Sequence, residues 1–478
     1  MSNLINLNKF WAEKTTNDHN YNPSAHTEQI VAKRPDYFGW NFTEWPVSPS
    51  YSLGDIRIGY AGITPEELFD AISIARSNPG ATFFVNISTG SDTNNGLSAE
   101  TAVKSLWKAV SLANTSGIPS KIIVAPGIYP RTNSFGGGSS PRVDIALIAN
   151  GGTVICGPFD QYENPSLDET YTNTYSWALQ NIARIVDIQN RTPLGGYTEL
   201  ISVSSAAICN ETPGSWFADE SKVYIRRLDS SPITHLNTRV YRRLTHNLAI
   251  GKRISVFIGG INSDSRWSFE GGLLASISYS SSDALLENKQ ALIVKNASML
   301  YPGNYIDSTT ARCVEVNSLN GIAAFFNVNC VGAMTDGFNY HNSVNPLAVL
   351  YSLNVNCSGS DFGRLNNESC NALTLHEDVY GIDICGDYCL SRGGGIRNKG
   401  TSQLWAIGTK VKDDMGDGII TPTSIMIDGS SKLWAESVNC SQSSNGFSWY
   451  CTENAEIHLK ASPYGRNDGG QGLIDEYL

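Results

Sequence analysis

This chain of 478 residues has few charged side chains, and those it has form no basic cluster. Charged residues make up only 17% of the sequence, and the net charge is −11. A protein that binds nucleic acid normally carries a basic face, so we expect no nucleic-acid partner. The chain also lacks any run of the ~18 apolar residues that a membrane helix requires, so we expect no membrane insertion.

Several sequence signatures are also missing. The first twenty residues lack the basic start and apolar core of a signal peptide, so we expect synthesis in a cytoplasm, with reduced cysteines. No C-x-x-C pair occurs, and Cys385 and Cys389 lack the matching partners of a zinc site. There is no GxSxG elbow, HExxH, P-loop or repeated Ca²⁺-binding nonapeptide. The sequence thus predicts neither a metal nor a cofactor.

What the chain does contain favours β structure. Apolar residues make up 41% of it, which is enough for a long core. Gly, Asn, Ser and Thr take the place of charged residues, and this composition is typical of turn-rich β folds rather than helix bundles.

The first 62 residues show no clear period and are crowded with aromatic residues. They include Phe10, Trp11, Tyr21, Tyr37, Phe38, Trp40, Phe42 and Trp45. Pro35, Pro46 and Pro49 interrupt any regular element. Such a segment cannot bury eight large rings by itself. Two interpretations stay open: the segment packs against a partner protein or another copy of the chain, or it lies as a strap along the neighbouring domain.

A specific pattern follows this segment. Thr64-Pro65-Glu66-Glu67 is a capping box that opens a short helix. Residues 81–130 then contain a strand, the polar turn GSDTNNG, an amphipathic helix and a buried strand. The helical face consists of Val103, Leu106, Trp107 and Val110. This pattern resembles the opening of pectate-lyase-like β-helix proteins, in which the helix plugs the end of the solenoid. The superfamily includes pectate lyases, epimerases, glycoside hydrolases and bacteriophage tailspikes, so the resemblance implies a fold and not one activity.

A repeat in the last third of the chain provides an independent argument. Five turns with their following strands can be superposed: DGFNYH (336–341), NALTLH (371–376), GGIRNK (394–399), DGIITP (417–422) and NGFSWY (445–450). The spacing between equivalent positions is typical of a solenoid with one turn of chain per repeat. Because side chains alternate along a strand, one inward column is predicted to contain Phe338, Leu373, Ile396, Ile419 and Phe447. A second column is predicted to contain Cys330, Cys357, Cys385 and Cys440.

The predicted fold is therefore all-β: a single-stranded right-handed parallel β-helix with an N-terminal capping helix. We expect residues 1–80 to form an N-terminal attachment and oligomerisation segment, 81–460 the β-helix, and 461–478 a C-terminal tail. Residues from roughly 160 to 290 are less regular, and GSWFADESKVYIRRLD predicts a β-hairpin among them. We expect this stretch to contain a lateral excursion.

The same alternation places polar side chains on the outside of the strands. Asn339, Thr374 and Arg397 are predicted to form one column. His341, His376 and Lys399 form the next, with Glu377 directly after His376. Parallel strands lie ~4.8 Å apart, so these side chains should stand side by side. A single surface histidine is more often mere solvated surface, but such a group on adjacent coils is a candidate site.

These residue types fit β-elimination at a uronic acid. Arg397 or Lys399 would pair with the sugar carboxylate. A neighbouring cation lowers the pKa of His376, which keeps the imidazole neutral and able to accept a proton. His341 or Tyr380 would protonate the leaving oxygen. The expected substrate-binding residues are Arg397, Lys399, Asn339 and Tyr340.

Hydrolysis is the competing chemistry, and it requires two carboxyl groups ~5–9.5 Å apart. Acidic residues lie in or near the turns of the same coils: Asp336, Asp361, Asp383, Asp387, Asp413 and Asp414. Asp is also an ordinary turn former, so most of these are expected to be structural. We select Asp336, Glu377 and Asp414 as the catalytic candidates for this chemistry.

The resemblance and the missing secretion signal together favour a bacteriophage tailspike. Such a protein is made in the host cytoplasm, becomes part of the virion tail, and recognises and depolymerises a host surface polysaccharide. By resemblance we expect a homotrimer, attached to other virion proteins through residues 1–62. The short tail after residue 460 leaves open how the trimer is locked. A non-virion polysaccharide lyase or epimerase is the first alternative, and a glycan-binding fibre without enzymatic activity is the second.

Overall fold

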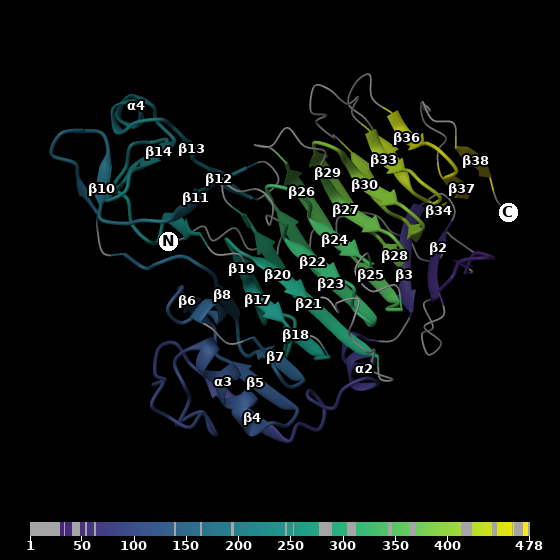
Figure 1. The fold of residues 1–478 in the computed structure, drawn as a ribbon, viewed down its shortest axis with the longest axis horizontal. Helices are drawn as coiled ribbons and strands as arrows, with labels where there is room; N and C mark the ends of the chain where they lie inside the picture. Colours follow the sequence, from purple (N-terminus) through teal and green to yellow (C-terminus); the bar gives the residue numbers. More distant parts are fainter. Residues whose placement is uncertain are drawn as a thin grey trace.

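The chain is built mostly of β-strands in large parallel sheets (Figure 1). The computed structural model describes residues 29–32, 34–40, 48–52, 55–61, 64–137, 140–162, 165–192, 196–243, 246–251, 253–276, 289–303, 312–342, 347–363, 370–412, 423–441, 447–460, 462 and 472–476. Within these ranges, no helix is both long enough and apolar enough to cross a membrane.

Successive turns of the chain stack on one another, and each adds strands to three parallel ladders, here called faces A, B and C. Face A contains β4 (Ala81–Val85), β5 (Ser120–Val124), β7 (Ile145–Ala149), β18 (Val256–Gly260), β25 (Leu350–Val355), β28 (Val379–Ile384), β31 (Gln403–Ile407), β34 (Lys432–Glu436), β37 (Glu456–Lys460) and β38 (Leu473–Glu476). Face B contains β6 (Gly127–Tyr129), β8 (Thr153–Cys156), β19 (Arg266–Glu270), β26 (Ser358–Phe362), β29 (Asp387–Ser391), β32 (Lys410–Lys412) and β35 (Asn439–Ser441).

Face C is a separate eight-stranded sheet that faces the viewer in Figure 1. It contains β17 (His246–Ile250), β20 (Leu273–Ser276), β22 (Val314–Asn317), β24 (Phe338–His341), β27 (Asn371–His376), β30 (Gly394–Lys399), β33 (Thr423–Ile427) and β36 (Phe447–Cys451). Faces A and B join because β21 (Gln290–Leu300) and β23 (Gly321–Val331) run through the corner between them. Asn296 and Asn327 turn that corner with positive φ, which Asn tolerates better than most residues.

The inward column of face C confirms the first part of the predicted repeat. Phe338 pairs with Leu373 and Leu373 with Ile396, and all three are buried in one core. Beyond Ile396 the column continues with Ile425 and Trp449, so the prediction of Phe447 is wrong. The alignment relied on the turn dipeptide at 417–418, but β33 begins only at Thr423. Ile419 itself lies outside the described residues.

The predicted cysteine column is half correct. Through the register of face B, Cys330 and Cys440 occupy the same position on different coils. Cys357 instead follows the end of β25, and Cys385 turns the next corner with a φ of 56°. All ten cysteines are free thiols, and Cys357 is a buried member of the core.

The predicted capping helix closes the first coil. It is α3 (Leu106–Ser116), and its buried side chains Leu106, Ala109, Val110 and Ala113 join the core beside Phe83 and Val85 of β4. Val103 lies before the helix, in a bridge with Val85. The capping box is also present, at the start of α2 (Pro65–Asp70). A 3-10 turn, η1 (Phe135–Gly137), follows β6.

An antiparallel lateral domain leaves the coils after β8. It contains β9 (Ser166–Leu167), β10 (Tyr175–Trp177), β11 (Ile182–Arg191), β12 (Tyr197–Glu199), β13 (Ile201–Ser202), α4 (Ala206–Glu211), β14 (Ser215–Ala218), β15 (Val223–Arg226) and β16 (Thr238–Arg242). The parallel coils resume at β17, so the excursion ends well before residue 290. The buried Arg184 anchors the domain by pairing with Glu199 and donating to the carbonyl of Pro302.

The described part of the aromatic N-terminal segment lies as a strap on the outside of face A. Phe38 and Trp40 are buried there, and their rings contact those of Trp434 and Tyr351 at centroid distances of 5.5 and 5.0 Å. Between them, the Gly39 amide donates to Gln403 Oε1 at 2.7 Å. A Cβ at Gly39 would lie 2.4 Å from the Tyr380 ring, so only glycine fits. The strap interpretation therefore holds for residues 34–40. The strands β1 (Gln29–Val31), β2 (Ser48–Ser52) and β3 (Asp55–Ala61) form a small antiparallel sheet beside it.

We expect Phe38→Ala and Trp40→Ala to destabilise the protein by about 3–5 kcal/mol each, the usual cost of truncating a buried aromatic residue. Tyr37→Ala is the matched control, because Tyr37 directly precedes Phe38 in the same segment and is 93% exposed. Thermal unfolding of the three variants measures the difference. Equal melting temperatures would show that the strap adds no stability. Because deleting residues 1–62 removes these anchors, we expect that truncated chain to aggregate.

Candidate functional site

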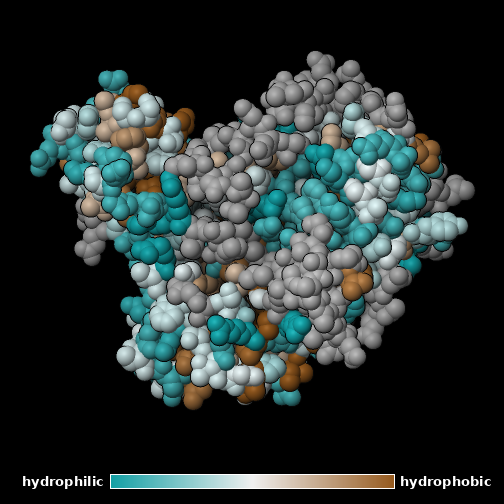
Figure 2. Space-filling view, viewed as in Figure 1, coloured by the Kyte–Doolittle hydropathy of each residue, from teal (hydrophilic) through white to brown (hydrophobic). Residues whose placement is uncertain are grey.

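The predicted polar columns come together on the outer side of face C. His341 pairs with His376, and His376 pairs with Lys399, on three adjacent strands. Figure 2 shows a hydrophilic surface over this part of the molecule. The alignment made from the repeat is therefore confirmed for these three residues.

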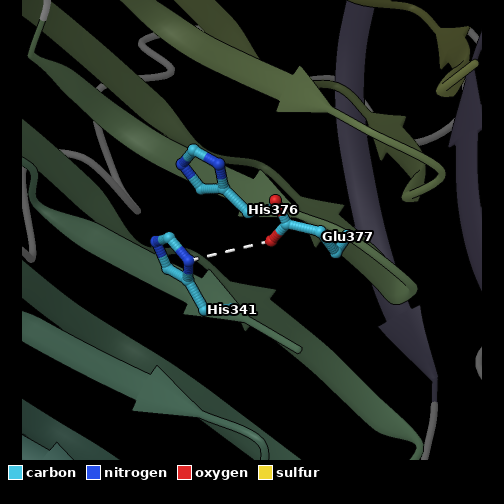
Figure 3. A group of neighbouring side chains, drawn as sticks. All are labelled: His341, His376 and Glu377. Atoms are coloured by element: carbon cyan, nitrogen blue, oxygen red, sulfur yellow. Dashed lines mark ion pairs between the residues drawn. The ribbon is translucent and has the colours of Figure 1, made fainter. Parts of the chain in front are cut away.

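The two histidines stack face to face. Their ring centroids are 4.0 Å apart, with an interplanar angle of 15° (Figure 3). The carboxylate of Glu377 faces them from the end of β27, with Oε2 3.9 Å from His341 Nδ1. Glu377 forms the turn after β27 with a φ of 46°. Gly400 and Gly429 form the equivalent turns after β30 and β33. A left-handed residue other than glycine costs about 1 kcal/mol, and such strain is concentrated at functional sites.

Burial and nearby cations keep both imidazoles uncharged. Burial lowers the pKa of His341 to about 4, and Arg312 contributes to this shift. For His376, burial again has the largest effect, with His341 and Lys399 next, and the pKa falls to about 3. Burial raises the pKa of Glu377, and the attraction of Lys399 partly offsets this rise. At neutral pH the stacked rings can therefore accept a proton.

Cationic side chains surround the stack. Arg397 pairs with Asp428 on the following coil at 2.8 Å. Arg312 pairs with Glu315 at 2.8 Å, and Glu315 lies on β22, the strand next to the one that carries His341. Lys399 is exposed at the end of β30. The site therefore suits a ligand that carries negative charge.

Several polar atoms of the site are shielded from solvent without a hydrogen-bond partner in the described chain. They are His341 Nε2, Glu377 Oε2, Asn339 Oδ1, Asn371 Oδ1 and Thr374 Oγ1. Each buried polar group without a partner costs about 1–3 kcal/mol, and native structures keep few of them. Of these atoms, His341 Nε2 and Glu377 Oε2 belong to the partly exposed cluster itself, where the hydroxyl groups of a ligand would satisfy them.

Two predicted substrate-binding residues are not accessible. Asn339 lies in the outward column but is fully buried, and its amide donates to Asp336 at 2.7 Å. Tyr340 points into the core, where its hydroxyl donates to Asn354 at 2.7 Å. Strand alternation explains the second error, because Tyr340 lies between two outward residues. Tyr380, a predicted acid, lies on face A against the strap.

Asp336 and Glu377 do not form a hydrolytic pair. Asp336 accepts from the Asn371 amide at the start of β27, whereas Glu377 follows the end of that strand. Asn371 and His376 are five positions apart in the sequence, which corresponds to about 16 Å along a strand. Inverting and retaining hydrolases place their carboxyls within about 9.5 Å. Asp414 lies outside the described residues.

Asp383, another of the turn carboxylates considered, lies in the core between the parallel sheets. It is fully buried and accepts from the hydroxyls of Tyr388 and Thr409. Burial raises its pKa from 3.8 to about 6. It is therefore a core residue and not part of the site.

This buried carboxyl predicts a pH-dependent stability. Its folded-state pKa lies above the unfolded value, so its stabilising contribution is present below about pH 4 and is lost as the pH rises to about 6. The difference corresponds to about 3 kcal/mol. In Asp383→Asn this loss should be absent, so the variant gains stability relative to the parent above pH 6. Melting temperatures at several pH values test this, with the exposed Asp378→Asn as control. A difference between parent and Asp383→Asn that does not change with pH would contradict the prediction.

The cluster of His341, His376 and Glu377 has the residue types of a metal site, with ligand atoms within 4.8 Å of one another. Its geometry is unfavourable for this role. Lone pairs of nearly parallel rings do not converge on one ion, and Arg312, Arg397 and Lys399 add repulsion. We therefore assign no metal to it.

The sequence analysis missed Arg312, Glu315 and Asp428. The repeat was not extended back to β22, which carries Glu315, and Arg312 lies just before that strand. Asp428 follows β33, whose start was misplaced. A register that placed Ile425 opposite Ile396 would have placed Asp428 beside Lys399.

Comparison with known proteins gives limited information. No family model matches the chain, and no curated protein matches it. Among solved structures it is similar to XylC, solved in complex with xylose, with 10% identity, a TM-score of 0.39, and coverage of 82% of this chain and 65% of that one. It is also similar to a glycoside hydrolase, with 10% identity, a TM-score of 0.38, and coverage of 83% and 96%. A third similar structure is the tailspike protein gp49 from Pseudomonas phage LKA1, with 10% identity, a TM-score of 0.23, and coverage of 78% and 71%.

Proposed function

We propose that this chain is a right-handed parallel β-helix protein that cleaves an acidic polysaccharide by β-elimination on face C. The observation that carries this proposal is the stacked pair of His341 and His376 beside Lys399 and Arg397. The polar atoms without partners around the pair support it, because a sugar offers the missing hydrogen bonds.

The reaction assigns one role to each accessible group. Lys399 and Arg397 hold the carboxylate of a uronic acid and so acidify the neighbouring C5–H bond. His376 accepts the C5 proton, and the released electron pair forms the C4=C5 double bond. The bond from C4 to the glycosidic oxygen breaks, and Glu377 gives that oxygen a proton. His341 supports His376 by stacking on it.

Elimination and hydrolysis leave different products, which makes the proposal testable. Purified protein is incubated with acidic polysaccharides such as alginate, polygalacturonate and hyaluronan, and with capsule or exopolysaccharide from bacterial hosts. Shorter chains with a rise in ultraviolet absorbance from an unsaturated uronate are the expected result. Shorter chains without that absorbance would overturn elimination in favour of hydrolysis.

The rate should also depend on pH in a characteristic way. His376 must be neutral, which holds above about pH 3, and Glu377 must be protonated, which holds only below its raised pKa. Depolymerisation is therefore expected to be faster near pH 5 than near pH 8. A rate that increases steadily up to pH 8 would rule out Glu377 as the acid.

For the biological setting, we propose a bacteriophage tailspike that acts on a host surface polysaccharide as a homotrimer. Mass spectrometry of purified phage particles tests for the chain in virions, and light scattering of the purified protein gives the number of subunits. Absence from virions together with elimination activity would favour the bacterial lyase instead.

A further inference from the structure

The lateral domain carries three aromatic rings on a side that its core does not use. Its five-stranded sheet buries Trp216, Val223 and Ile225 on one side, in a cluster with Ile185 of β11. The residues that alternate with these along each strand point to the other side of the sheet. There Ser176 of β10, Tyr224 of β15 and Phe217 of β14 lie next to one another across the three strands. The rings of Phe217 and Tyr224 therefore lie outside this core.

Tyr171 extends this row into a strip of three rings, here called the ring strip. Tyr224 lies at its centre, with centroids 6.0 Å from both Phe217 and Tyr171. The ring of Phe217 stacks on that of Tyr224 with an interplanar angle of 29°. The ring of Tyr171 meets the ring of Tyr224 edge-on, at an angle of 87°. All three rings are partly exposed, and none belongs to a hydrophobic cluster of the described chain. Partly exposed rings that support no core mark a binding surface.

Polar groups border the ring strip on both sides. Asp168 and Asp219 lie along one side, where Asp219 bonds to the Tyr224 hydroxyl and Asp168 accepts from Ser176 at 2.6 Å. Asn173 and Asn210 lie near α4 on the other side, where the Asn173 amide donates to the Asn210 side chain at 2.9 Å. An apolar floor between hydrogen-bonding borders matches a pyranose ring, which has C–H faces and hydroxyl edges.

The charges decide which sugar fits. The carboxylates of Asp168 and Asp219 are balanced by two cations: Lys222, which is 3.9 Å from Asp168, and Arg226, which lies on the same side of β15 as Tyr224 and donates to the Asn210 carbonyl. An anionic sugar would find no net positive charge at the strip, whereas Lys399 is exposed on face C. From the strip and its borders, we propose that the lateral domain is a second glycan-binding site, which stacks neutral pyranose units on Tyr171, Phe217 and Tyr224. In Figure 1 the lateral domain stands to the left of face C.

The test uses the full chain on an array of neutral and acidic glycans, followed by titration of the best neutral ligand. Tyr224→Ala and Phe217→Ala should weaken binding about tenfold or more, as for truncation of a central aromatic contact. Tyr171→Ala tests the same strip from a turn outside the sheet, so it does not depend on the strands staying intact. Tyr224→Phe keeps the ring and should keep most of the binding. Ile201→Ala on β13, where the side chain is 63% exposed, is the matched control and should bind as the parent does.

The outcomes separate this site from the one on face C. Binding of a neutral glycan that is lost in the three alanine variants and retained in His376→Ala supports the ring strip, whether or not face C cleaves anything. The proposal is overturned if no neutral glycan binds, or if the alanine variants bind like the parent. It is equally overturned if every bound glycan is acidic and Lys399→Ala abolishes its binding.

Discussion

Replacing His376 by alanine is expected to lower the rate of depolymerisation by ~10²–10⁴-fold, the usual contribution of a general base. The fold should survive, because the side chain lies on the outer side of β27 and makes no core contact. We expect the free energy of unfolding to change by about 1 kcal/mol or less. Ultraviolet absorbance measures the rate, and thermal unfolding measures the stability.

Companion variants separate the roles within the site. Lys399→Ala should weaken substrate binding and so raise KM, whereas His376→Ala should lower kcat with binding retained. Glu377→Gln keeps the shape of the corner but cannot donate the carboxyl proton, so it should also lower kcat. His235→Ala, a histidine of the lateral domain, is the control and should leave both constants unchanged. If His376→Ala retains full turnover while Asp336→Asn abolishes it, the base lies at the other end of the strand and our assignment is wrong.

Replacing Ile396 by aspartate should unfold the middle of the parallel sheets. Ile396 is fully buried between Leu373 and Ile425, so the new carboxylate would have no partner. A charge buried in this way costs several kcal/mol, which is a large part of the stability of a typical domain. Each coil pairs only with its neighbours, so loss of one coil exposes the core of the next. Circular dichroism and the yield of soluble protein report the loss.

Met426→Asp is the matched control for this variant. Met426 lies on the adjacent strand, points outward beside Arg397, and is only partly buried. Its replacement should therefore be tolerated, and the new carboxylate has an arginine nearby. Equal stability of the two variants would mean that Ile396 does not face the core and that the register of face C is incorrect.

Local patterns in the sequence determined much of the parallel sheets. Alternation along a strand and the spacing of coils are enough to place Phe338, Leu373 and Ile396 inside, and His341, His376 and Lys399 outside. Both patterns depend on residues close in sequence and on the fixed geometry of parallel strands. These patterns gave a wrong register where a strand starts later than its turn motif suggests, as β33 does at Thr423.

Only the tertiary structure decided which polar residues are accessible and which are near one another. Alternation gives the side of a strand but not what covers it, so the burial of Asn339 was not predictable. Asp336 and Glu377 belong to neighbouring repeats in sequence, yet they lie at opposite ends of the strands. Asp383 follows a turn-former pattern but sits inside the core.

The strap and the ring strip depend most clearly on contacts between residues that lie far apart in the sequence. Gly39 bonds to Gln403 across 364 residues, and no local period links the two. Phe217 and Tyr171 meet Tyr224 only because the antiparallel sheet brings β14, β15 and the turn before β10 together. The sequence by itself determined the coil and its two sides, because these follow from short-range backbone geometry. The structure decided the contacts between distant segments, because these depend on how whole elements pack.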